Sequence, residues 1–533
     1  MPEAISTVEE RPLADDSTVS VESPTDPFAS SDDPDHNAPL DNIIPPSHPY
    51  RTLVLCFDGT GDQFDSDNSN IIQFFTMLKK DDSSQQMVYY QAGIGTYTTP
   101  QVATPLMAKF SKARLTQGFD RALDEAIAWN LHAHVMGGYE FLMQNYTAGD
   151  RICIFGFSRG AYTARSLAGM IHKVGILPKC NHQQVPFAYK MYTREDDVGW
   201  QQSNAFKKAF SVHADIEFLG VWDTVNSVGL FPRRLPFTTS NTIVRTFRHA
   251  VSLDERRAKF KANLWNRPNT QEETLGISST RKKSHHKKEL KERPKNVHKS
   301  HSLRALERKY NKDHSQPTDV EEVWFAGCHC DVGGGSVSND TTVNLARIPL
   351  RWMIRECFKT NTGILFDCDG LRDLGMDPDA LYPEVLPRPP PLPVGDAHIQ
   401  DIPTEGSVSK AEKESALKNY SGHTSETAGA LVKTEEQLEL LDALSPIYDQ
   451  LSLKWFWWIL EFFPIKQRFQ RGDNSWASYL GWNLGRGRFI PKQKKQGVKV
   501  HRSVKMRLDA QHKDGSKYQP KANIDFDCVT WVD

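Results

Sequence analysis

A serine between two glycines is the first group in this chain that could do chemistry. The run Gly156-Phe157-Ser158-Arg159-Gly160 fits the pattern G-x-S-x-G, in which a serine stands on a sharp turn between a strand and a helix. The glycines keep Cβ atoms away from both flanking elements, and the backbone N–H after the serine points to where an oxyanion would form. We interpret Ser158 as a nucleophile and the Arg159 N–H as an oxyanion-hole donor. The alternative is a turn without chemistry.

A serine nucleophile needs a base that takes its proton and an acid that orients the base. Where this pentapeptide is catalytic, the partners follow in the order Asp or Glu, then His. Asp223 in "FLGVWDTVNSVG" and His329 in "VWFAGCHCDVGGG" each come directly after a strand-like run. We therefore expect His329 to accept the Ser158 proton and Asp223 to hold the imidazole. The alternatives are a helix N-cap for Asp223 and a core histidine for His329.

Two neighbours of the histidine have competing interpretations. Asp331 is a rival acid, but its loop would have to curl sharply to reach the ring, so we interpret it as organising the glycine loop 333–335. Cys328-His329-Cys330 could suggest a metal site. Adjacent residues rarely converge on one ion, and no second Cys/His pair has zinc-like spacing. We predict no metal and no cofactor.

The loop after the first strand-like run is the candidate for a second oxyanion-hole donor. It reads Asp58-Gly59-Thr60-Gly61, and its glycines permit a close approach of the backbone. We therefore assign the Gly59 and Thr60 N–H groups to this role. The alternative is a simple tight turn.

The elements that must position these residues alternate between strand-like and helix-like runs. Apolar runs typical of buried strands begin at Thr52, Met87, Arg151, Ile216 and Glu322. A long helix-like run begins at Gly118, and apolar residues recur at helical spacing from Ala161 to Val174, with Gly175 as C-cap. This alternation predicts an α/β fold whose mostly parallel central sheet is flanked by helices.

Composition divides the chain into four parts. Residues 1–48 are acidic, with Arg11 the only Lys or Arg before Pro45, and we predict a disordered tail. Residues 49–385 hold the catalytic core, interrupted by a long basic insertion at about 267–317 that we expect to be disordered. Residues 386–434 are Pro-rich and then polar, which is typical of a linker. Residues 435–533 contain helical and β-like runs that complete the catalytic domain.

Net charge, targeting signals and cysteine content indicate the compartment in which the protein is expected. The 65 Lys and Arg residues nearly balance the 66 Asp and Glu residues, so net charge indicates no partner. No basic segment followed by an apolar run opens the chain, and no window reaches the roughly 18 apolar residues that span a bilayer. Eight cysteines without a secretory signal favour reduced thiols. We expect an intracellular, cytoplasmic protein without a signal peptide or transmembrane helix.

Several motifs together resemble one known family. In order they are "FDGTGD", "YYQAGIGT", "GYEFLMQNYTAGDRICIFGFSRGAYTAR", "FLGVWDTVNSVG", "HAVSLDERRAKFKANLW", "VWFAGCHCDVGGG" and "VHRSV". They resemble an α/β-hydrolase-like family that includes the catalytic domain of type VI secretion phospholipase effectors and many fungal proteins. The resemblance runs from about Arg51 to Arg507 and implies hydrolysis of lipid or phospholipid acyl esters. It places the catalytic roles on Ser158, Asp223 and His329.

The chain departs from that family at two positions. Asp62 stands where the family motif DGTGN has its asparagine, and Cys330 stands where HSDVGGG has its serine. Neither departure removes a member of the expected triad. The first changes the loop to which Gly59 and Thr60 belong.

Two segments bear on further partners. The segment Trp455–Ile465 is rich in Trp and Phe, and is either a buried helix over the site or an interfacial helix on lipid. The basic insertion near Arg281 is either a solvated loop or a patch for anionic lipid, nucleic acid or nuclear import. It lacks interleaved aromatic residues, so we expect no specific nucleic-acid partner. We expect a lipid or other acyl-ester substrate and possible peripheral membrane contact.

These observations favour a serine esterase or lipase that uses a Ser-His-Asp triad, and the resemblance implies phospholipids among its substrates. One alternative is a catalytically silent binding or scaffold protein on a hydrolase fold. Another is hydrolysis of a different bond, such as a thioester.

Overall fold

The computed structural model describes more than two-thirds of the chain, in nine ranges. These are 42–94, 119–225, 235–265, 307, 317–402, 433–462, 464–470, 476–491 and 493–533. Nearly all of the predicted acidic tail, most of the basic insertion and the second part of the predicted linker therefore lie outside the described residues. All described residues belong to one compact unit, Asp41–Asp533.

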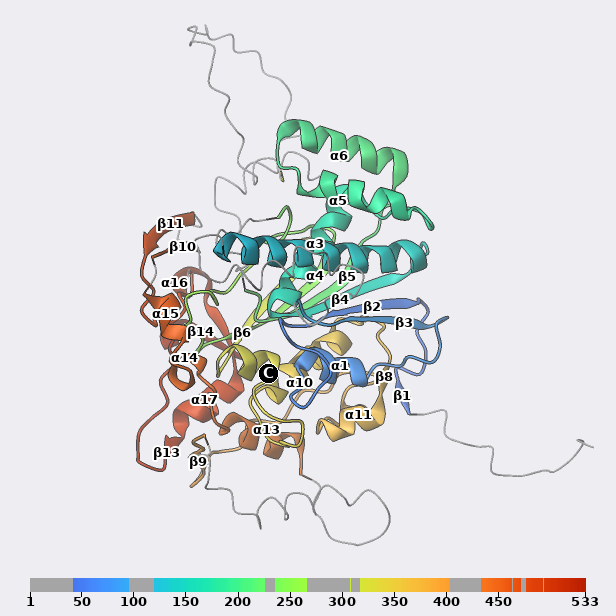
Figure 1. The fold of residues 1–533 in the computed structure, drawn as a ribbon. Coiled ribbons are helices and arrows are strands. Elements are labelled where there is room, and N and C mark those ends of the chain that lie inside the picture. Colours follow the sequence, from blue (N-terminus) through green and yellow to red (C-terminus); the bar gives the residue numbers. More distant parts are fainter. Residues whose placement is uncertain are drawn as a thin grey trace, which may run out of the picture. The chain divides into compact units, whose positions relative to one another are not determined.

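A parallel eight-stranded sheet forms the middle layer (Figure 1). Its spatial order is β14-β12-β7-β6-β5-β4-β2-β3, and each neighbouring pair is parallel. The strands are β2 (Thr52–Phe57), β3 (Gln86–Gln91), β4 (Arg151–Phe157), β5 (Ile216–Trp222), β6 (Val244–Ser252), β7 (Asp319–Phe325), β12 (Val498–His501) and β14 (Val529–Val532). This confirms the predicted mostly parallel α/β sheet.

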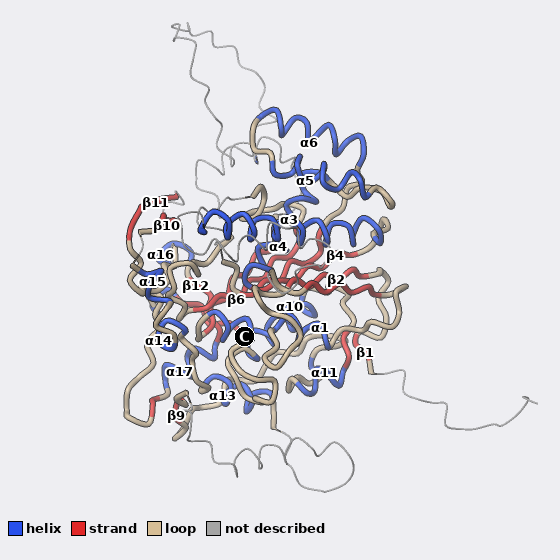
Figure 2. Tube along the Cα trace, viewed as in Figure 1, coloured by secondary structure: helices blue, strands red, loops and turns tan. Residues whose placement is uncertain are grey.

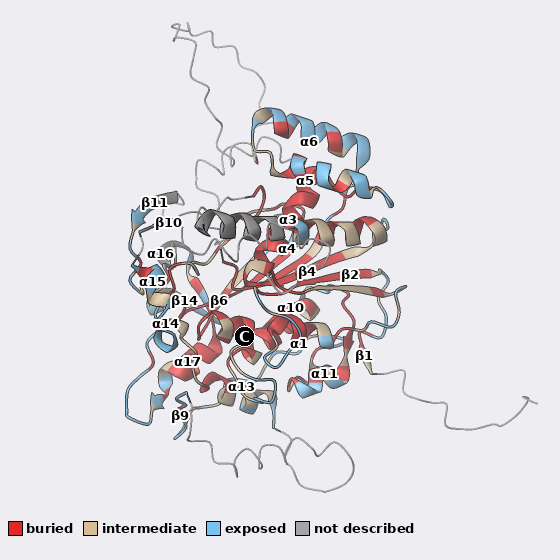
Figure 3. Ribbon diagram, in the orientation of Figure 1, coloured by how far each residue is buried: buried red, intermediate tan, exposed pale blue. Residues whose placement is uncertain are grey.

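The central strands β2, β4 and β5 are largely apolar and buried on both faces, because each face of the sheet carries its own core. In β2, Leu53 and Leu55 pack into one apolar cluster, whereas Val54 and Cys56 pack into the other. Successive side chains of a strand point to opposite faces, so a strand covered on both sides must be apolar throughout. Figure 3 shows these strands buried between the helical layers.

Two layers of helices cover the sheet (Figure 2). One apolar cluster holds buried residues of α3 (Phe119–Asn145), α4 (Ser158–Val174), α5 (Val185–Thr193) and α6 (Asp197–Phe210). The other holds residues of α1 (Asn70–Thr76), α10 (Arg347–Lys359), α11 (Cys368–Asp373), α13 (Glu435–Ala443) and α17 (Arg502–Asp509). No helix in the described ranges is both long and apolar enough to cross a membrane.

Shorter elements decorate these layers. They are the strands β1 (Ile43–Ile44), β8 (Phe366–Asp367), β9 (His398–Ile399), β10 (Ile465–Gln470), β11 (Trp476–Gly481) and β13 (Gln511–His512), the helices α9 (His329–Gly333), α14 (Gln450–Leu453), α15 (Trp457–Glu461) and α16 (Gln493–Gln496), and three 3₁₀ turns at His182–Gln184, Pro378–Ala380 and Phe526–Cys528. Of the short strands, β10 and β11 pair antiparallel over six residues each.

The strand order places a topological switch between β2 and β4. From β2 the chain adds β3 on one side, and then crosses to β4 on the other side of β2. The loops after β2 and β4 therefore diverge, which is where open parallel sheets bind their ligands. These loops carry Gly59, Thr60 and Ser158.

Three parts of the chain differ from the sequence-based expectation. Within 435–533, the run from Val498, which its sequence predicts to be β-like, is strand β12 followed by helix α17. The Pro-rich start of the predicted linker is exposed along most of its length, but Arg388 joins it to α13 through ion pairs with Glu439 at 3.0 Å and with Glu435 at 3.5 Å. Within Trp455–Ile465, α15 spans only five residues and Trp455 is 77% exposed, so this segment is not a buried helix.

Candidate active site

Ser158 occupies a strained turn between β4 and α4. Its φ is 57°, in the left-handed region that costs a non-glycine residue conformational energy. A Cβ on Gly160 would lie 2.2 Å from the Asp58 carbonyl oxygen, and one on Gly156 would lie 2.6 Å from the Gly160 carbonyl oxygen. The two glycines therefore allow the turn to pack against the end of β2, and the geometry matches the predicted elbow.

The structure brings the three predicted triad residues together from three strand ends. The Ser158 Oγ lies 2.7 Å from His329 Nε2, and His329 Nδ1 lies 2.5 Å from Asp223 Oδ2. Ser158 follows β4, Asp223 follows β5, and His329 begins α9 shortly after β7. All three are buried, with Ser158 4% exposed. Two hydrogen bonds therefore join the three side chains in the order of a nucleophile, a base and an acid that orients the base.

Arg488 is a fourth member of this cluster that sequence reasoning missed. Its Nη1 lies 2.5 Å from Asp223 Oδ1 and its Nη2 lies 2.8 Å from Asp223 Oδ2. The same guanidinium donates to the Ser252 hydroxyl at 2.8 Å and to the Phe260 carbonyl at 2.6 Å. Arg488 is thus fully engaged and buried, and it fixes the Asp223 carboxylate at two points.

The charge state of Asp223 is set by its partners. Burial by itself would raise the pKa of this carboxyl, but the Arg488 charge and the hydrogen bond with His329 lower the pKa below its usual range. The Ser252 N–H also donates to Asp223 Oδ1 at 2.9 Å. Asp223 is therefore held as a carboxylate, as an acid that orients a histidine must be.

The imidazole of His329 is held neutral in an aromatic and buried setting. Burial lowers its pKa below the usual value, against the raising effect of the Asp223 carboxylate. The Phe157 ring lies 4.7 Å and the Phe260 ring 4.9 Å from the imidazole centroid. A neutral histidine beside a serine hydroxyl can act as a general base.

The predicted oxyanion-hole residues lie at the elbow, but they are not equivalent. Arg159 is the second residue of α4, where backbone N–H groups have no intrahelical acceptor. The Gly59 N–H already donates to Asp58 Oδ1 at 2.8 Å, so its assignment as a donor is not supported by this geometry. Thr60, the next residue of that loop, has a buried hydroxyl that makes no hydrogen bond within the described part of the chain.

The two departures from the family motif lie in the same neighbourhood. Burial raises the pKa of Asp62 to about 8, helped by the nearby Asp58, while the charge of Arg159 opposes the shift. Burial likewise raises the pKa of the Cys330 thiol, so Cys330 is a neutral thiol. Asp62 is thus partly protonated near neutral pH and resembles the asparagine it replaces more than a free carboxylate does.

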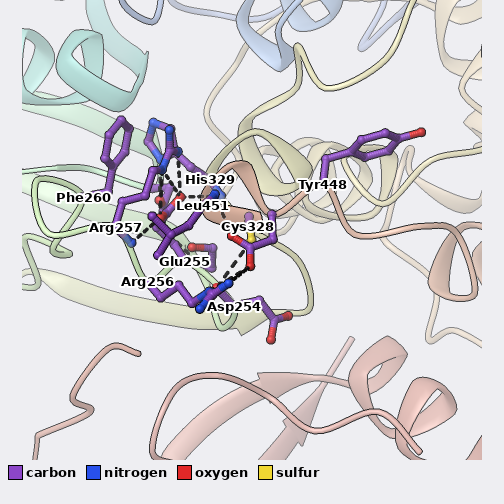
Figure 4. Close-up of polar contacts among 12 residues, drawn as sticks. Asp254, Glu255, Arg256, Arg257, Phe260, Cys328, His329, Tyr448 and Leu451 are labelled. Carbon is purple, nitrogen blue, oxygen red and sulfur yellow. Dashed lines mark hydrogen bonds and ion pairs between the residues drawn. The ribbon is translucent and has the colours of Figure 1, made fainter. Parts of the chain in front are cut away.

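Side chains of the loop after β6 lie near His329, among them Glu255, Arg257 and Phe260 (Figure 4). Glu255 and Arg257 form a buried ion pair at 2.7 Å. The Arg257 guanidinium lies 3.6 Å from the Phe260 ring centroid and 4.7 Å from that of Trp457. Phe260 in turn meets the His329 ring edge-on. Phe260 and Arg257 therefore connect the imidazole to Trp457 of α15, a connection that the sequence did not predict.

The Asp331 carboxylate binds backbone and hydroxyl groups around His329. The Asp331 carboxylate accepts hydrogen bonds from the Cys328 N–H at 2.8 Å, the Tyr448 N–H at 3.0 Å and the Ser336 hydroxyl at 3.0 Å. It therefore organises the glycine loop and does not contact the imidazole. Among the described residues, no three or more His, Cys, Asp or Glu side chains are grouped so as to hold a metal ion.

The larger of two cavities described has no triad residue in its lining. It encloses about 510 Å³ and is lined by residues that include Asp254, Cys328 and Arg507, but not by Ser158. The smaller encloses about 200 Å³ beside Trp265 and Trp324. Neither cavity is lined by Ser158.

Comparison with known proteins gives one relative of similar extent. An uncharacterized protein of Saccharomyces cerevisiae, YEL023C, is 29% identical over 573 aligned residues, which cover 90% of this chain and 82% of that protein. Its description carries no activity.

Solved structures resemble the chain weakly. An uncharacterized protein from Pseudomonas aeruginosa covers 74% of this chain at 17% identity and a TM-score of 0.30, and the match takes in 53% of that protein. The Tle1 effector bound to the VgrG spike of the type 6 secretion system covers 54% of this chain at 16% identity and a TM-score of 0.24, with 52% of the effector matched. The chain spans about half the length of these solved proteins.

The sequence model of one family matches more than half of the chain. It describes the catalytic domain of Tle1-like type VI secretion phospholipase effectors and matches residues 51–356. The matched range includes Ser158, Asp223 and His329 and ends before Arg488. At the level of the family, this supports a hydrolase of the lipase or phospholipase type. The chain belongs to the Tle1-like phospholipase effector family, and its residues 51–356 correspond to the catalytic domain of that family.

Proposed function

We propose that this protein is a serine carboxylic-ester hydrolase that cleaves acyl esters of phospholipids. The observation that carries the proposal is the continuous hydrogen-bonded path from Ser158 Oγ through the His329 imidazole to Asp223. The family, whose name specifies phospholipase effectors, supports phospholipid as the substrate class. The strained elbow supports a nucleophile over a structural turn, because such strain persists where it serves a site.

The proposed reaction proceeds through an acyl-enzyme. Ser158 Oγ attacks the ester carbonyl carbon while its proton passes to His329 Nε2. The N–H groups of Arg159 and Thr60 stabilise the tetrahedral oxyanion. When this intermediate collapses, the bond to the alcohol breaks, and His329 returns the proton to the leaving oxygen. A water molecule, deprotonated by His329, then cleaves the acyl-enzyme, releasing the fatty acid and the Ser158 hydroxyl.

Asp223 and Arg488 act on this reaction through His329. The Asp223 carboxylate accepts the Nδ1–H and stabilises the imidazolium that forms in each step. Arg488 prevents that carboxylate from rotating or taking up a proton, because it binds both oxygens. The proposal therefore includes a positioning residue from outside the part of the chain that the family model matches.

A fluorophosphonate probe tests the proposal without knowledge of the natural ester. Such a probe is attacked by an activated serine, so wild-type protein should be labelled, whereas Ser158→Ala and His329→Ala should not. Ser166→Ala is the matched control, since Ser166 lies in the same helix and its hydroxyl donates to the Tyr162 carbonyl. Folded wild-type protein that stays unlabelled would refute the hydrolase proposal. The buried Ser158 would then favour the catalytically silent binding protein.

A further inference from the structure

Large apolar side chains are exposed on two adjoining segments at the edge of the fold. Six of them define what we call the aromatic face. They are Trp455 (77% exposed), Phe456 (49%), Ile459 (50%), Phe462 (62%), Leu480 (72%) and Trp482 (58%). They belong to α15 with its flanks and to the end of β11 with the turn that follows. Single exposed apolar residues are ordinary, but a cluster of this size marks an interaction surface.

Buried hydrogen bonds join the two segments of the aromatic face. Glu461 of α15 is 1% exposed, and its Oε2 accepts from the Asn483 amide at 2.6 Å and from the Gly485 N–H at 2.8 Å. Its Oε1 accepts from the Ala258 N–H. The Trp458 indole donates to the Leu451 carbonyl at 2.9 Å. The exposed side chains are therefore presented by a fixed scaffold.

Within the two segments that carry the aromatic face, the exposed charged residues are basic. Residues 453–462 and 476–489 contain one acidic residue, Glu461, which is buried and fully hydrogen-bonded. Lys454 and Arg486 lie in the same segments and are exposed. Trp and Phe flanked by basic residues are the side chains that favour the boundary between lipid headgroups and acyl chains. A lipid surface with phosphate groups complements this pattern.

Two aromatic contacts link α15, which carries part of the aromatic face, to His329 of the triad. Trp457, between Phe456 and the rest of α15, packs edge-on against Phe260 at 5.7 Å between ring centroids, and Phe260 packs against His329. Ala258, which donates to Glu461, lies in the same loop as Phe260. A surface held by α15 would therefore lie near the histidine.

We propose that the aromatic face docks the protein on the surface of a phospholipid bilayer, with Trp455, Phe462 and Leu480 entering the headgroup region. The docking proposal rests on the proposed function in one respect, since a protein docked on a bilayer lies at the surface that contains its proposed phospholipid substrate. A second copy of the chain or a partner protein could also cover an apolar face. The basic flank and the Trp-rich composition favour the bilayer, because a phosphate surface satisfies Lys454 and Arg486.

Vesicle flotation tests the docking separately from turnover. All proteins carry Ser158→Ala, so that binding is measured without hydrolysis, and the vesicles are phosphatidylcholine with or without phosphatidylserine. The protein should float with both, more strongly with phosphatidylserine at low salt. Adding Trp455→Ser and Leu480→Ser should reduce binding about tenfold or more, because each change removes apolar area that would enter the bilayer.

A matched control removes exposed apolar area elsewhere. Phe187 of α5 and Phe210 of α6 are 47% and 54% exposed, so Phe187→Ser with Phe210→Ser should leave flotation unchanged. Equal flotation of the aromatic-face variant and the parent would overturn the proposal. So would a parent that never floats but self-associates through this face, as seen by light scattering.

Turnover is read separately from docking. With Ser158 restored, the aromatic-face variant should hydrolyse a soluble short-chain ester at the wild-type rate and vesicle phospholipid more slowly. If the short-chain ester is never cleaved while flotation holds, the proposed function fails and the docking surface stands.

Discussion

Arg488 and Asp223 form a two-point ion pair behind the candidate histidine, at 2.5 Å and 2.8 Å, although 265 positions separate them in the sequence. Both side chains are buried. Breaking such a pair on one side leaves an uncompensated charge, which costs about 3–5 kcal/mol. The acid of the triad is therefore fixed by a residue from the last tenth of the chain, beyond the part that the family model matches.

Replacing Arg488 should change the pH dependence of activity as well as its level. Arg488→Gln removes a positive charge near the Asp223–His329 pair, so the imidazolium becomes more stable and the pKa of His329 rises. The acid limb of kcat/KM on a soluble ester should move to higher pH, and kcat should fall by about tenfold or more. Arg488→Lys keeps the charge and should leave the limb closer to that of the wild type. An unmoved limb in Arg488→Gln would reduce Arg488 to a packing residue.

The acid limb of the wild-type protein should itself lie low. Burial lowers the pKa of His329 below 6.5, and the base must be neutral to accept the Ser158 proton. Activity should therefore be constant from pH 7 upward through the neutral range and should fall only as the pH drops through that lowered pKa. A pH series of kcat/KM with a soluble ester measures this. A midpoint above 7 would show that the imidazole does not experience the buried environment described.

The elbow glycine Gly160 should tolerate no side chain. Its Cβ would lie 2.2 Å from the Asp58 carbonyl oxygen and 2.3 Å from that of Phe57, and backbone atoms cannot move aside cheaply. Gly160→Ala should lose activity and about 1–3 kcal/mol of stability in urea unfolding. Gly149→Ala is the control, because a Cβ there meets no atom within 4 Å and costs only the strain of φ 102°. Comparable activity in both variants would argue against the tight packing of the elbow.

Restoring the family residue at position 62 should stabilise the protein at neutral and basic pH. The folded-state pKa of Asp62 is raised to about 8, above its unfolded value, so the folded state loses stability as the pH rises from about 4 to 8. Asp62→Asn removes this loss, so its gain in the free energy of unfolding should be larger at pH 8 than at pH 5. Thermal unfolding at both pH values measures the difference, with Asp396→Asn as an exposed control. A gain that does not grow with pH would contradict the raised pKa.

Much of the central sheet and the grouping of three site residues followed from local patterns. Four of the strands were recognisable because their apolar runs end at Asp58, Ser158, Asp223 and the loop before His329. Parallel strands bring such ends to one edge. The elbow was recognisable because its tight turn leaves no room for a Cβ at Gly156 or Gly160.

What escaped prediction depends on long-range pairing. β6 was missed because Arg248 and His249 make it look polar, yet both are buried and paired, with Glu356 at 2.6 Å and Glu322 at 2.9 Å. Arg488 sits in a glycine-rich turn without a motif. No local pattern in either segment indicates the partner, because the partner comes from a distant element.

The most direct test of the account is the release of fatty acid from phosphatidylcholine in mixed micelles, compared between wild-type protein and Ser158→Ala of equal stability. The proposed triad predicts release by the wild type, a loss of at least about a thousandfold in Ser158→Ala, and a similar loss in His329→Ala because the two residues act as one unit. Release that persists undiminished in Ser158→Ala would contradict the assignment of the nucleophile. Absence of release from the folded wild type, with soluble esters still cleaved, would contradict phospholipid as the substrate.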